Sequence, residues 1–518
     1  MSSKFFHHVL IFCMIVIASQ GNAEEVQKAG SWRVWTPLDF GAKGDGISLD
    51  TGAIQAAIDA CAAAGGGRVV LPKGIYLSGS LHLRSGVVFH LDPGSILRGS
   101  PDNSDYDPYE QLGFENDSDR ETSFFHFALI WGEDLENIGI EGTGIIDGNR
   151  SKRGGPKPIA LKRCSQVRIT GITIENAPNY CISLLGVDYA LIEGVTIRKA
   201  HCDGIDPDCC RHVRISNCQI ESWDDAIVPK TSFSLGEHRP TEFLTITNCQ
   251  LATASNCFKL GTESGGDFRN ITVSNCVMYP LGHRHPTSGI SLESVDGSKL
   301  RGVAIANISM RDVEVPIFIR LGNRGRDMEI PTPGVIEDVL ISNVVAEGAT
   351  RACSITGIPG HKVKGVTLSD IRLRYQGGGS SEDLGVEVPE LIDRYPDADM
   401  FKKLPAFGLY CRHGEDFVFR NVQLHVEKED GRHALYAEDV SDLSIVGLRS
   451  ENKSQTPLMH LKEVQQASIR IDRLAEGSPL MAVSGKTTMG IAVERYLLEL
   501  PGMIQLQEEV QGDSVTGR

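Results

Sequence analysis

Aromatic side chains are scarce in this sequence: Phe, Trp and Tyr make up 6% of its 518 residues, while glycine occurs 55 times. Such a composition favours many short strands and turns over long helices. Runs rich in Lys and Arg are also missing, and 67 acidic residues outnumber 51 basic ones. The resulting formal charge of -16 argues against a nucleic acid as a partner.

Long apolar runs are missing beyond the N-terminus. Lys4 precedes the apolar segment 9–18, and small residues follow it up to Ala23. These features predict a signal peptide over 1–23, with an uncleaved anchor as the alternative. No later segment is apolar enough to span a bilayer. We therefore expect a secreted or periplasmic protein that has no membrane partner after the signal is removed.

The spacings of Cys and His that bind metals are absent. Cys209 and Cys210 are adjacent, so they do not form a CxxC pair, and no HxxxH motif accompanies them. The sequence therefore predicts neither a metal nor another cofactor.

Cysteine usage points in two directions. Removal of Cys13 with the signal peptide leaves twelve cysteines, and an even number in an exported chain is compatible with disulfides. Three cysteines recur in similar SNC or TNC contexts, which predicts buried apolar positions: Cys218, Cys249 and Cys276. Three others are candidates for a disulfide: Cys202, Cys209 and Cys210.

What the chain does contain is a repeat. Short segments of alternating apolar residues are interrupted by one turn residue and then alternate again, mostly every 23 to 36 residues. Gly, Asn and Asp tolerate the left-handed backbone of a tight bend between two strands. These residues occupy the bends: Gly142, Gly171, Gly194, Asn217, Asn248, Asn275, Asn307, Asn343, Asp370, Asn421 and Gly447.

A unit this short cannot bury its apolar face alone, but stacked units can. The repeat therefore predicts an all-β parallel β-helix. A β-propeller has a longer period with four antiparallel strands per unit, and a leucine-rich repeat lacks support in the Leu pattern.

Other segments complete the predicted domain organisation. Residues 50–67 form an amphipathic helix that caps the open end of the solenoid. We expect an N-terminal cap with the first strands over 24–100, the β-helix over 101–480 and a C-terminal cap or tail over 481–518. A segment rich in Gly, Pro and charge, about 376–407, is predicted to be an insertion over one face.

Acidic residues cluster in DGIDPD at 203–208 and in the pair Asp224-Asp225. Residues one turn apart in a parallel β-helix lie about 4.8 Å apart. We align the strands that follow each bend so that the following residues stack: Tyr180, Asp203, Asp225, Asn256, Ser288 and Pro316. Three carboxylates then share one patch, in which like charges raise at least one pKa.

A protonated acid beside an ionised carboxylate is the arrangement that glycosidic cleavage requires. The stacked trio Asp203, Asp224 and Asp225 is therefore the candidate catalytic site. For Asp206 and Asp208 we favour a structural role as turn residues.

These motifs resemble those of the polygalacturonase family of pectin-degrading glycoside hydrolases. CDGIDPD (202–208) resembles the Asn-Thr-Asp signature at Asp203, DD (224–225) matches the Asp-Asp signature, and GTESGGDFRNITVSNC (261–276) resembles the segment after Gly-His-Gly. The resemblance implies a right-handed β-helix and inverting hydrolysis. It also implies that Asp224 is the general acid, while Asp203 and Asp225 hold and activate water.

The chain departs from the family at two signatures. Asn256 stands where the family histidine is expected, and Phe318-Ile319-Arg320 stands where Arg-Ile-Lys is expected. The family's cations bind the substrate carboxylate, a task for which the planar fork of Arg is suited. The candidates to rebuild this site are Lys230, Lys259, Arg320, Arg324 and Arg326, with Asn256, His283 and His285 as further residues near the cleft.

The sequence as a whole predicts an exported, monomeric glycoside hydrolase that acts on an acidic, plant-type pectic polysaccharide. Two alternatives remain. One is a uronate lyase with Ca²⁺ held by Asp203, Asp224 and Asp225 and with Lys230 as the base. The other is a β-helix that binds carbohydrate without catalysis.

Overall fold

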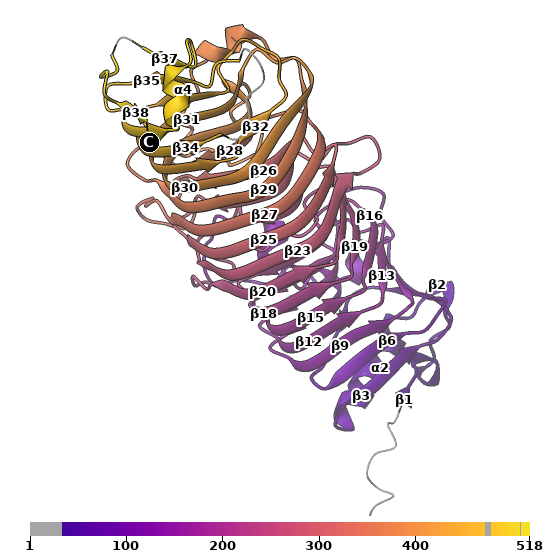
Figure 1. The fold of residues 1–518 in the computed structure, drawn as a ribbon. Coiled ribbons are helices and arrows are strands. Elements are labelled where there is room, and N and C mark those ends of the chain that lie inside the picture. The colour runs from indigo at the N-terminus through magenta and orange to yellow at the C-terminus, as the bar shows by residue number, and fades with distance from the viewer. Residues whose placement is uncertain (1–33, 472–477, 508, 518) are drawn as a thin grey trace, which may run out of the picture.

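Parallel strands stacked along one axis make up nearly the whole molecule (Figure 1). The computed structural model describes residues 34–471, 478–507 and 509–517, so the predicted signal peptide lies outside the described residues. The N-terminal strands lie at one end of the stack and the C-terminus at the other. The prediction of a right-handed parallel β-helix is confirmed.

Three parallel sheets run along the solenoid. The first, called the site sheet below, contains β5 (Leu81–His82), β8 (Ala128–Glu133), β11 (Lys157–Lys162), β14 (Ile182–Leu185), β17 (Ile205–Asp208), β22 (Asn256–Leu260), β24 (Ser288–Ser294), β26 (Val315–Leu321), β28 (Cys353–Thr356), the first parts of β30 (Ala406–Lys428) and β31 (His433–Val446), β33 (Met459–Lys462), β35 (Met481–Ser484) and β37 (Ile504–Leu506). Bridges through Ile227 join β17 to β22.

The second sheet contains β1 (Val34–Trp35), β3 (Gly67–Leu71), β6 (Val87–Leu91), β9 (Glu136–Gly142), β12 (Ser165–Thr170), β15 (Asp188–Glu193), β18 (Arg211–Ser216), β20 (Thr241–Thr247), the first halves of β23 (Phe268–Pro280), β25 (Lys299–Arg311), β27 (Val335–Ala349) and β29 (Val363–Gly377), later parts of β30 and β31, β34 (Gln465–Arg470), β36 (Met489–Val493) and β38 (Val515–Gly517).

The third sheet contains β2 (Asp45–Leu49), β4 (Gly74–Ser78), β7 (Ser95–Gly99), β10 (Ile145–Asp147), β13 (Thr173–Glu175), β16 (Thr196–Ala200), β19 (Gln219–Ser222), β21 (Gln250–Thr253), the second halves of β23, β25, β27 and β29, the end of β30 and β32 (Arg449–Ser450). The strands after residue 480 continue the stacks of the first and second sheets.

The alternation of apolar residues produces the core. In β18, Val213 and Ile215 are buried while Arg214 between them is exposed, because successive strand residues point to opposite faces. Apolar residues of successive turns then stack inside the solenoid. Along the site sheet this column contains Ile182, Ile205, Ile227, Phe258, Ile290 and Ile317, all fully buried.

The bend between the second and third sheets has a left-handed backbone at every predicted position. All eleven turn residues have positive φ, from 49° at Asn421 to 117° at Gly142. Side chains of neighbouring turns also bond: Asn307 Nδ2 donates to Asn275 Oδ1 (3.0 Å), and Asn343 Nδ2 donates to Asn307 Oδ1 (3.1 Å). The bend is therefore held by backbone conformation and by a ladder of amides.

Helices close the N-terminal end and add little elsewhere. The predicted cap is α2 (Thr51–Ala63), which buries Ile54 and Ile58 against the first strands and ends before the left-handed Gly65. The remaining helices are short: η1 (Pro37–Phe40), η2 (Asn103–Asp105), α3 (Arg120–Ser123), η3 (Ser381–Gly385) and α4 (Arg495–Glu499). Among the described residues, no helix has the length and apolar character that a bilayer crossing requires.

The cysteines lie in the core and form no disulfides in the described chain. Cys218, Cys249 and Cys276 are buried, as predicted. The predicted disulfide among Cys202, Cys209 and Cys210 is wrong, because all three are buried free thiols. Cys209 and Cys210 instead donate to backbone carbonyl oxygens of Ser232 and Asp208, and burial raises the pKa of the Cys209 thiol.

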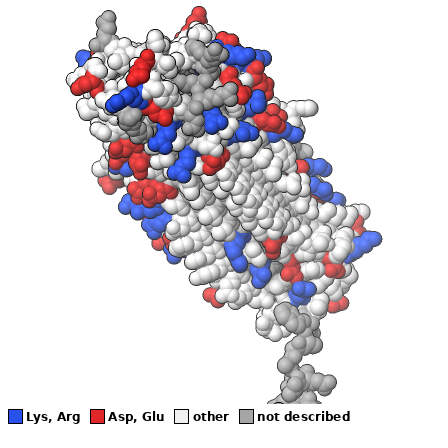
Figure 2. All heavy atoms as spheres, in the orientation of Figure 1, with Lys and Arg blue, Asp and Glu red and all other residues white. Residues whose placement is uncertain are grey.

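Charge is unevenly distributed over the surface. Figure 2 shows few charged residues over the middle of the face that is turned to the viewer. The outward column of the second sheet there is uncharged: Thr245, Thr272, Ala304, Leu340, Thr367 and Val418. A polyanion therefore has no cationic partners along this column.

The predicted insertion is an irregular segment between β29 and β30 that packs on the site sheet. Phe401 and Leu404 join Phe318 and Tyr410 in a separate apolar cluster. Arg320 reaches the segment from β26 and donates to the carbonyl oxygens of Glu390 (2.6 Å) and Leu391 (3.0 Å).

Asn307 should stabilise the bend in two ways, through its left-handed backbone and through its side-chain hydrogen bonds. Asn307→Ala should lower the free energy of unfolding by about 1–3 kcal/mol, because alanine resists positive φ and both amide bonds are lost. Asn307→Gly loses the bonds but keeps the conformation, so it should destabilise less. Urea unfolding of both variants measures the difference. Equal destabilisation would show that the left-handed backbone does not matter.

The anchoring role of Arg320 predicts that Arg320→Met loosens the insertion. Its guanidinium also donates to Thr356 and to the Gly357 carbonyl oxygen, so the free energy of unfolding should fall by about 2–4 kcal/mol. Limited proteolysis with mass spectrometry should find faster cleavage within 378–405. Lys403→Met, at an exposed ion pair with Asp383, is the control. New cleavage sites elsewhere would contradict the role.

Candidate active site

The predicted stacking register is correct over most of its length. The Cys181 amide donates to the Asp203 carbonyl oxygen (3.0 Å), the Gly204 amide to Asp225 (2.9 Å) and the Ala226 amide to Asn256 (2.9 Å). Asn256 pairs in turn with Ser288. The last predicted member was one residue late.

Val315, and not Pro316, pairs with Ser288. The apolar residue beneath this column is accordingly Ile317, while Phe318 packs in the cluster under the insertion. The predicted alignment was one residue late because Val315 and Phe318 are both apolar. Alternation of apolar residues therefore did not distinguish pairing of Ser288 with Val315 from pairing with Pro316.

The three candidate aspartates come together at one end of the site-sheet strands. A carboxylate oxygen of Asp203 and one of Asp224 lie within 4.8 Å of each other and of Cys202 Sγ. Asp203 and Asp225 are buried, but the Asp224 side chain is 32% exposed. Asp224 is therefore the carboxyl group that a polymer in the cleft can reach.

Each aspartate has its own cation. Lys230 Nζ contacts Asp203 Oδ2 (3.2 Å), and Lys259 Nζ contacts Asp225 Oδ2 (3.3 Å). Arg153 Nη1 contacts Asp224 Oδ2 (2.6 Å). Close pairing of this kind allows several carboxylates to occupy one small, partly buried volume.

Arg153 was not identified from the sequence. It lies in the loop before β11 and also pairs with Glu121 of α3, its Nε being 2.9 Å from Glu121 Oε1. Glu121, Arg153 and Asp224 are far apart in the chain and belong to no repeat, so no pattern linked them.

The surroundings shift the pKa values of the buried aspartates in opposite directions. Burial raises the pKa of Asp203 well above its ordinary value, and the nearby Asp206 raises it further. Burial also raises the pKa of Asp206 to about 6, although Lys230 at 2.7 Å opposes the shift. For Asp225, burial is outweighed by Lys259, Ser255 and Asn256, so its pKa is lowered. Asp225 is thus the ionised member.

Asn256, the residue at the expected histidine position, acts on Asp225. Its Nδ2 (2.7 Å) and its amide nitrogen (3.0 Å) both donate to Asp225 Oδ1, and Ser255 Oγ donates to the same oxygen (2.7 Å). Ser288 Oγ donates to Asn256 Oδ1 (2.6 Å) and fixes the amide orientation. Asn256 is buried and orients the carboxylate.

The other predicted substrate-binding residues differ in how far a ligand can reach them. Lys230 is buried under the Tyr180 ring (4.0 Å), and Lys259 is buried with its Nζ 3.3 Å from Tyr395 Oη. Arg320 is buried beneath the insertion. His283 lies on an exposed loop.

Next to His283, Arg284 stacks over the Trp223 ring at 4.4 Å. Trp223 directly precedes Asp224, so this loop lies near the mouth of the site. His285, on the same loop, has its Nδ1 2.9 Å from the Asp312 carbonyl oxygen.

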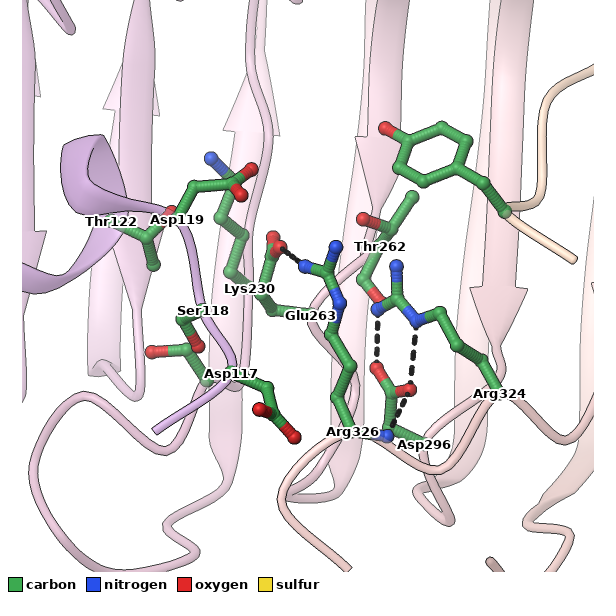
Figure 3. A network of polar contacts seen from close by, with 12 residues as sticks. Asp117, Ser118, Asp119, Thr122, Lys230, Thr262, Glu263, Asp296, Arg324 and Arg326 are labelled. Atoms are coloured by element: carbon green, nitrogen blue, oxygen red, sulfur yellow. Dashed lines mark hydrogen bonds and ion pairs between the residues drawn. The ribbon is translucent and has the colours of Figure 1, made fainter. Parts of the chain in front are cut away.

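Arg324 and Arg326 occupy the wall at the opposite end of the strands. Arg324 pairs with Asp296 through Nε (3.0 Å) and Nη2 (2.6 Å), and Arg326 Nη1 pairs with Glu263 Oε1 (3.0 Å). Figure 3 shows both guanidinium groups near Glu263 and Thr262, with Lys230 on the far side of Glu263.

Three segments outside the repeat border the site. The loop before β8 contacts Tyr180 through Thr122 (3.3 Å). It also meets the loop after β26, where the Asp117 amide donates to Asp327 Oδ1 (2.6 Å) and the Asp327 amide donates to Asp117 Oδ2 (3.1 Å). At the other end stands the insertion with Tyr395.

Within the described residues, Cys202, Asp203 and Asp224 are the grouping whose atoms could hold a metal ion. Lys230 and Arg153 already neutralise its two carboxylates. A calcium ion prefers six to eight oxygen ligands, so this grouping suits it poorly. Burial also raises the pKa of the Cys202 thiol well above its usual value, which disfavours the thiolate that binds metals.

A further buried acid, Glu293, stands behind Lys259. Its Oε1 accepts from Ser291 Oγ (2.6 Å), whereas Oε2 has no hydrogen-bond partner in the described part of the chain. Burial raises its pKa to about 8, although Lys259 opposes the shift.

The Glu293 pKa predicts a pH-dependent stability. Between about pH 4.5 and 8 the folded state holds a proton that the unfolded state has lost, so stability falls as the pH rises. Glu293→Gln should flatten this decline. Its melting temperature should therefore rise relative to that of the wild type as the pH increases towards 8. Thermal unfolding from pH 5 to 9 measures this. Glu337→Gln, on the outer face, is the control, and parallel profiles would contradict the shift.

Known proteins resemble this chain in sequence. The model of "Glycosyl hydrolases family 28" matches residues 111–389. A "Probable polygalacturonase" of Vitis vinifera is 26% identical over 367 residues, covering 65% of this chain and 73% of that protein. An "Exo-poly-alpha-D-galacturonosidase" of Dickeya chrysanthemi is 25% identical over 388 residues, covering 61% and 63%.

Among solved structures, an exopolygalacturonase from Thermotoga maritima superposes with a TM-score of 0.60 at 21% identity, covering 75% of this chain and 92% of that one. This likeness concerns the fold. The family match spans more than half of the chain and includes the aspartates, Asn256 and both arginines of the wall, and it shows that the protein belongs to glycosyl hydrolase family 28.

Proposed function

We propose that this protein hydrolyses glycosidic bonds of a uronate-containing pectic polysaccharide and inverts the anomeric carbon. The observation that carries the proposal is the trio of aspartates, in which Asp224 is accessible and Asp225 is held ionised. Family membership and the polygalacturonase names of relatives support a pectic substrate.

In the proposed reaction, Asp225 accepts a proton from water, and Asp203 holds that water. The water oxygen bonds to the anomeric carbon as the glycosidic bond breaks, and Asp224 gives its proton to the leaving oxygen. Asp224 must be protonated for this step. Arg153 therefore has to release Asp224, and Glu121 is the carboxylate that retains it.

The built-in cations favour hydrolysis over a lyase reaction. A calcium-dependent lyase would need the carboxylates to bind the ion, but Lys230, Arg153 and Lys259 already pair with them. Lys230 is also a poor base. Although burial by itself would lower its pKa, Asp206, Tyr180 and Asp203 raise that pKa well above the ordinary value, so it stays protonated.

We further propose action at chain ends or on short oligosaccharides, because the loop held by the Asp117–Asp327 contact and the insertion at Tyr395 border the site. We also propose export, for which the N-terminal sequence is the support. The protein is further proposed to act as a monomer.

Product analysis tests the proposal. The mature protein should release reducing ends from polygalacturonate or rhamnogalacturonan, without the ultraviolet absorbance of an unsaturated uronate. Solution viscosity should fall slowly, because cleavage at chain ends shortens the polymer little. Unsaturated products would indicate a lyase. Sugar binding without new reducing ends would indicate a non-catalytic module.

Substitution of the aspartates provides the matching prediction. Asp224→Asn and Asp225→Asn should each lower kcat by roughly 10²–10⁴-fold, because each removes one proton-transfer group. Asp338→Asn, at a left-handed turn on the outer side, exchanges the same groups and should leave kcat unchanged. Full activity in either site variant would overturn the assignment.

A further inference from the structure

Recognition of a uronate requires a cation with free hydrogen-bond donors near the aspartates. Lys230 and Lys259 are buried in ion pairs, and Arg320 is bound to the insertion. These residues stabilise the site, but their positive charge is already committed. Two arginines of the loop after β26, Arg324 and Arg326, have guanidinium nitrogens without a protein acceptor among the described residues.

Arg326 is the more open of the two arginines in this wall. Its side chain is 26% exposed, and Nη1 is fixed by Glu263. Its amide nitrogen donates to Asp296 Oδ1 (3.0 Å), which anchors the backbone as well. In the described structure, Nε and Nη2 have no protein acceptor, so one edge of the guanidinium remains available.

The contacts of Arg324 independently point to a ligand at this wall. Its side chain is 10% exposed, and Nε and Nη2 bind Asp296 while Nη2 also donates to the Thr262 carbonyl oxygen (2.8 Å). Nη1 is buried and has no partner among the described residues. A buried donor without an acceptor is costly, so a ligand oxygen at this point would stabilise the site.

The two arginines face the same part of the cleft. Thr262 and Glu263, which they contact, are adjacent in the chain, and the Glu263 carbonyl oxygen accepts from the Thr231 amide next to Lys230 (2.9 Å). Lys230 in turn contacts Asp203. Figure 3 shows these residues side by side, from Lys230 through Glu263 to Arg326 and Arg324. A sugar beside the aspartates therefore has this wall at its other edge.

We propose that Arg324 and Arg326 form a clamp that binds the carboxylate of the uronate in the cleft. The inference rests on the proposed function and assigns its specificity to the loop after β26. Glu263 and Asp296 act as positioning residues, because Glu263 holds the guanidinium of Arg326 and Asp296 holds that of Arg324. The reciprocal contact of Asp117 with Asp327, the residue after Arg326, secures the same loop.

The test compares an ionised substrate with its neutral counterpart. kcat/KM is measured on oligogalacturonate and on its methyl ester for the wild type, Arg326→Gln and Arg326→Lys. The wild type should prefer the ionised substrate. In Arg326→Gln this preference should fall by roughly 10- to 100-fold, through KM more than kcat, because a charged hydrogen bond is lost. Arg326→Lys should be intermediate, since lysine keeps the charge but not the fork.

A binding measurement separates this inference from the proposed chemistry. Calorimetry with galacturonate and galactose is performed on Asp224→Asn, with and without Arg324→Lys or Arg326→Gln. The clamp predicts that galacturonate binding weakens in both double variants while galactose binding does not. Arg301→Gln, exposed on β25, is the control, and melting temperatures confirm folding.

The possible failures can be distinguished. If the wild type hydrolyses the polymer but Arg326→Gln keeps the full preference for the ionised substrate, the clamp is wrong and the proposed function stands. If the wild type cleaves neither substrate and Asp224→Asn binds no galacturonate, the proposed function fails and the clamp fails with it.

Discussion

The left-handed bend at each turn of the solenoid is the constraint on which the rest of the structure depends. Asn, Asp or Gly at this bend fixes where the second sheet ends and the third begins, as the positive φ of Asn217 and Asn248 shows. Each turn therefore repeats the same path. Residues 22 or 31 positions apart then lie one strand spacing apart, and this places Asp203, Asp225 and Asn256 in one column.

Stacking also brings several carboxylates close together, and their repulsion has to be offset. Carboxylates brought this close would repel one another, and burial makes their ionisation harder still. A different cation pairs with each carboxylate: Lys230 with Asp203, Arg153 with Asp224 and Lys259 with Asp225. The environment can therefore keep Asp225 ionised while it raises the pKa of Asp203. The proposed reaction requires an ionised Asp225 as its base, whereas Asp224 is its proposed acid.

Loops outside the repeat border the aspartates on the site sheet. The loop around Asp117, the loop of Arg324 and Arg326, and the insertion with Tyr395 are all additions to the repeat. Cations committed to the aspartates stabilise the catalytic end, whereas the arginines of the loop retain free donors. In the proposed scheme, the stacked strands carry the catalytic aspartates, and the irregular segments carry the residues that recognise the substrate.

The sequence by itself determined the β-helix, its bends, the capping helix and the column up to Ser288, because alternation and turn residues are local and repeat. It did not determine the partners of the aspartates. Arg153 is 71 residues from Asp224, and Tyr395 is 136 residues from Lys259. The disulfide prediction failed since proximity in sequence does not bring thiols together across a strand. Only the tertiary structure decided these contacts, because loops outside the repeat follow no period that a pattern can extrapolate.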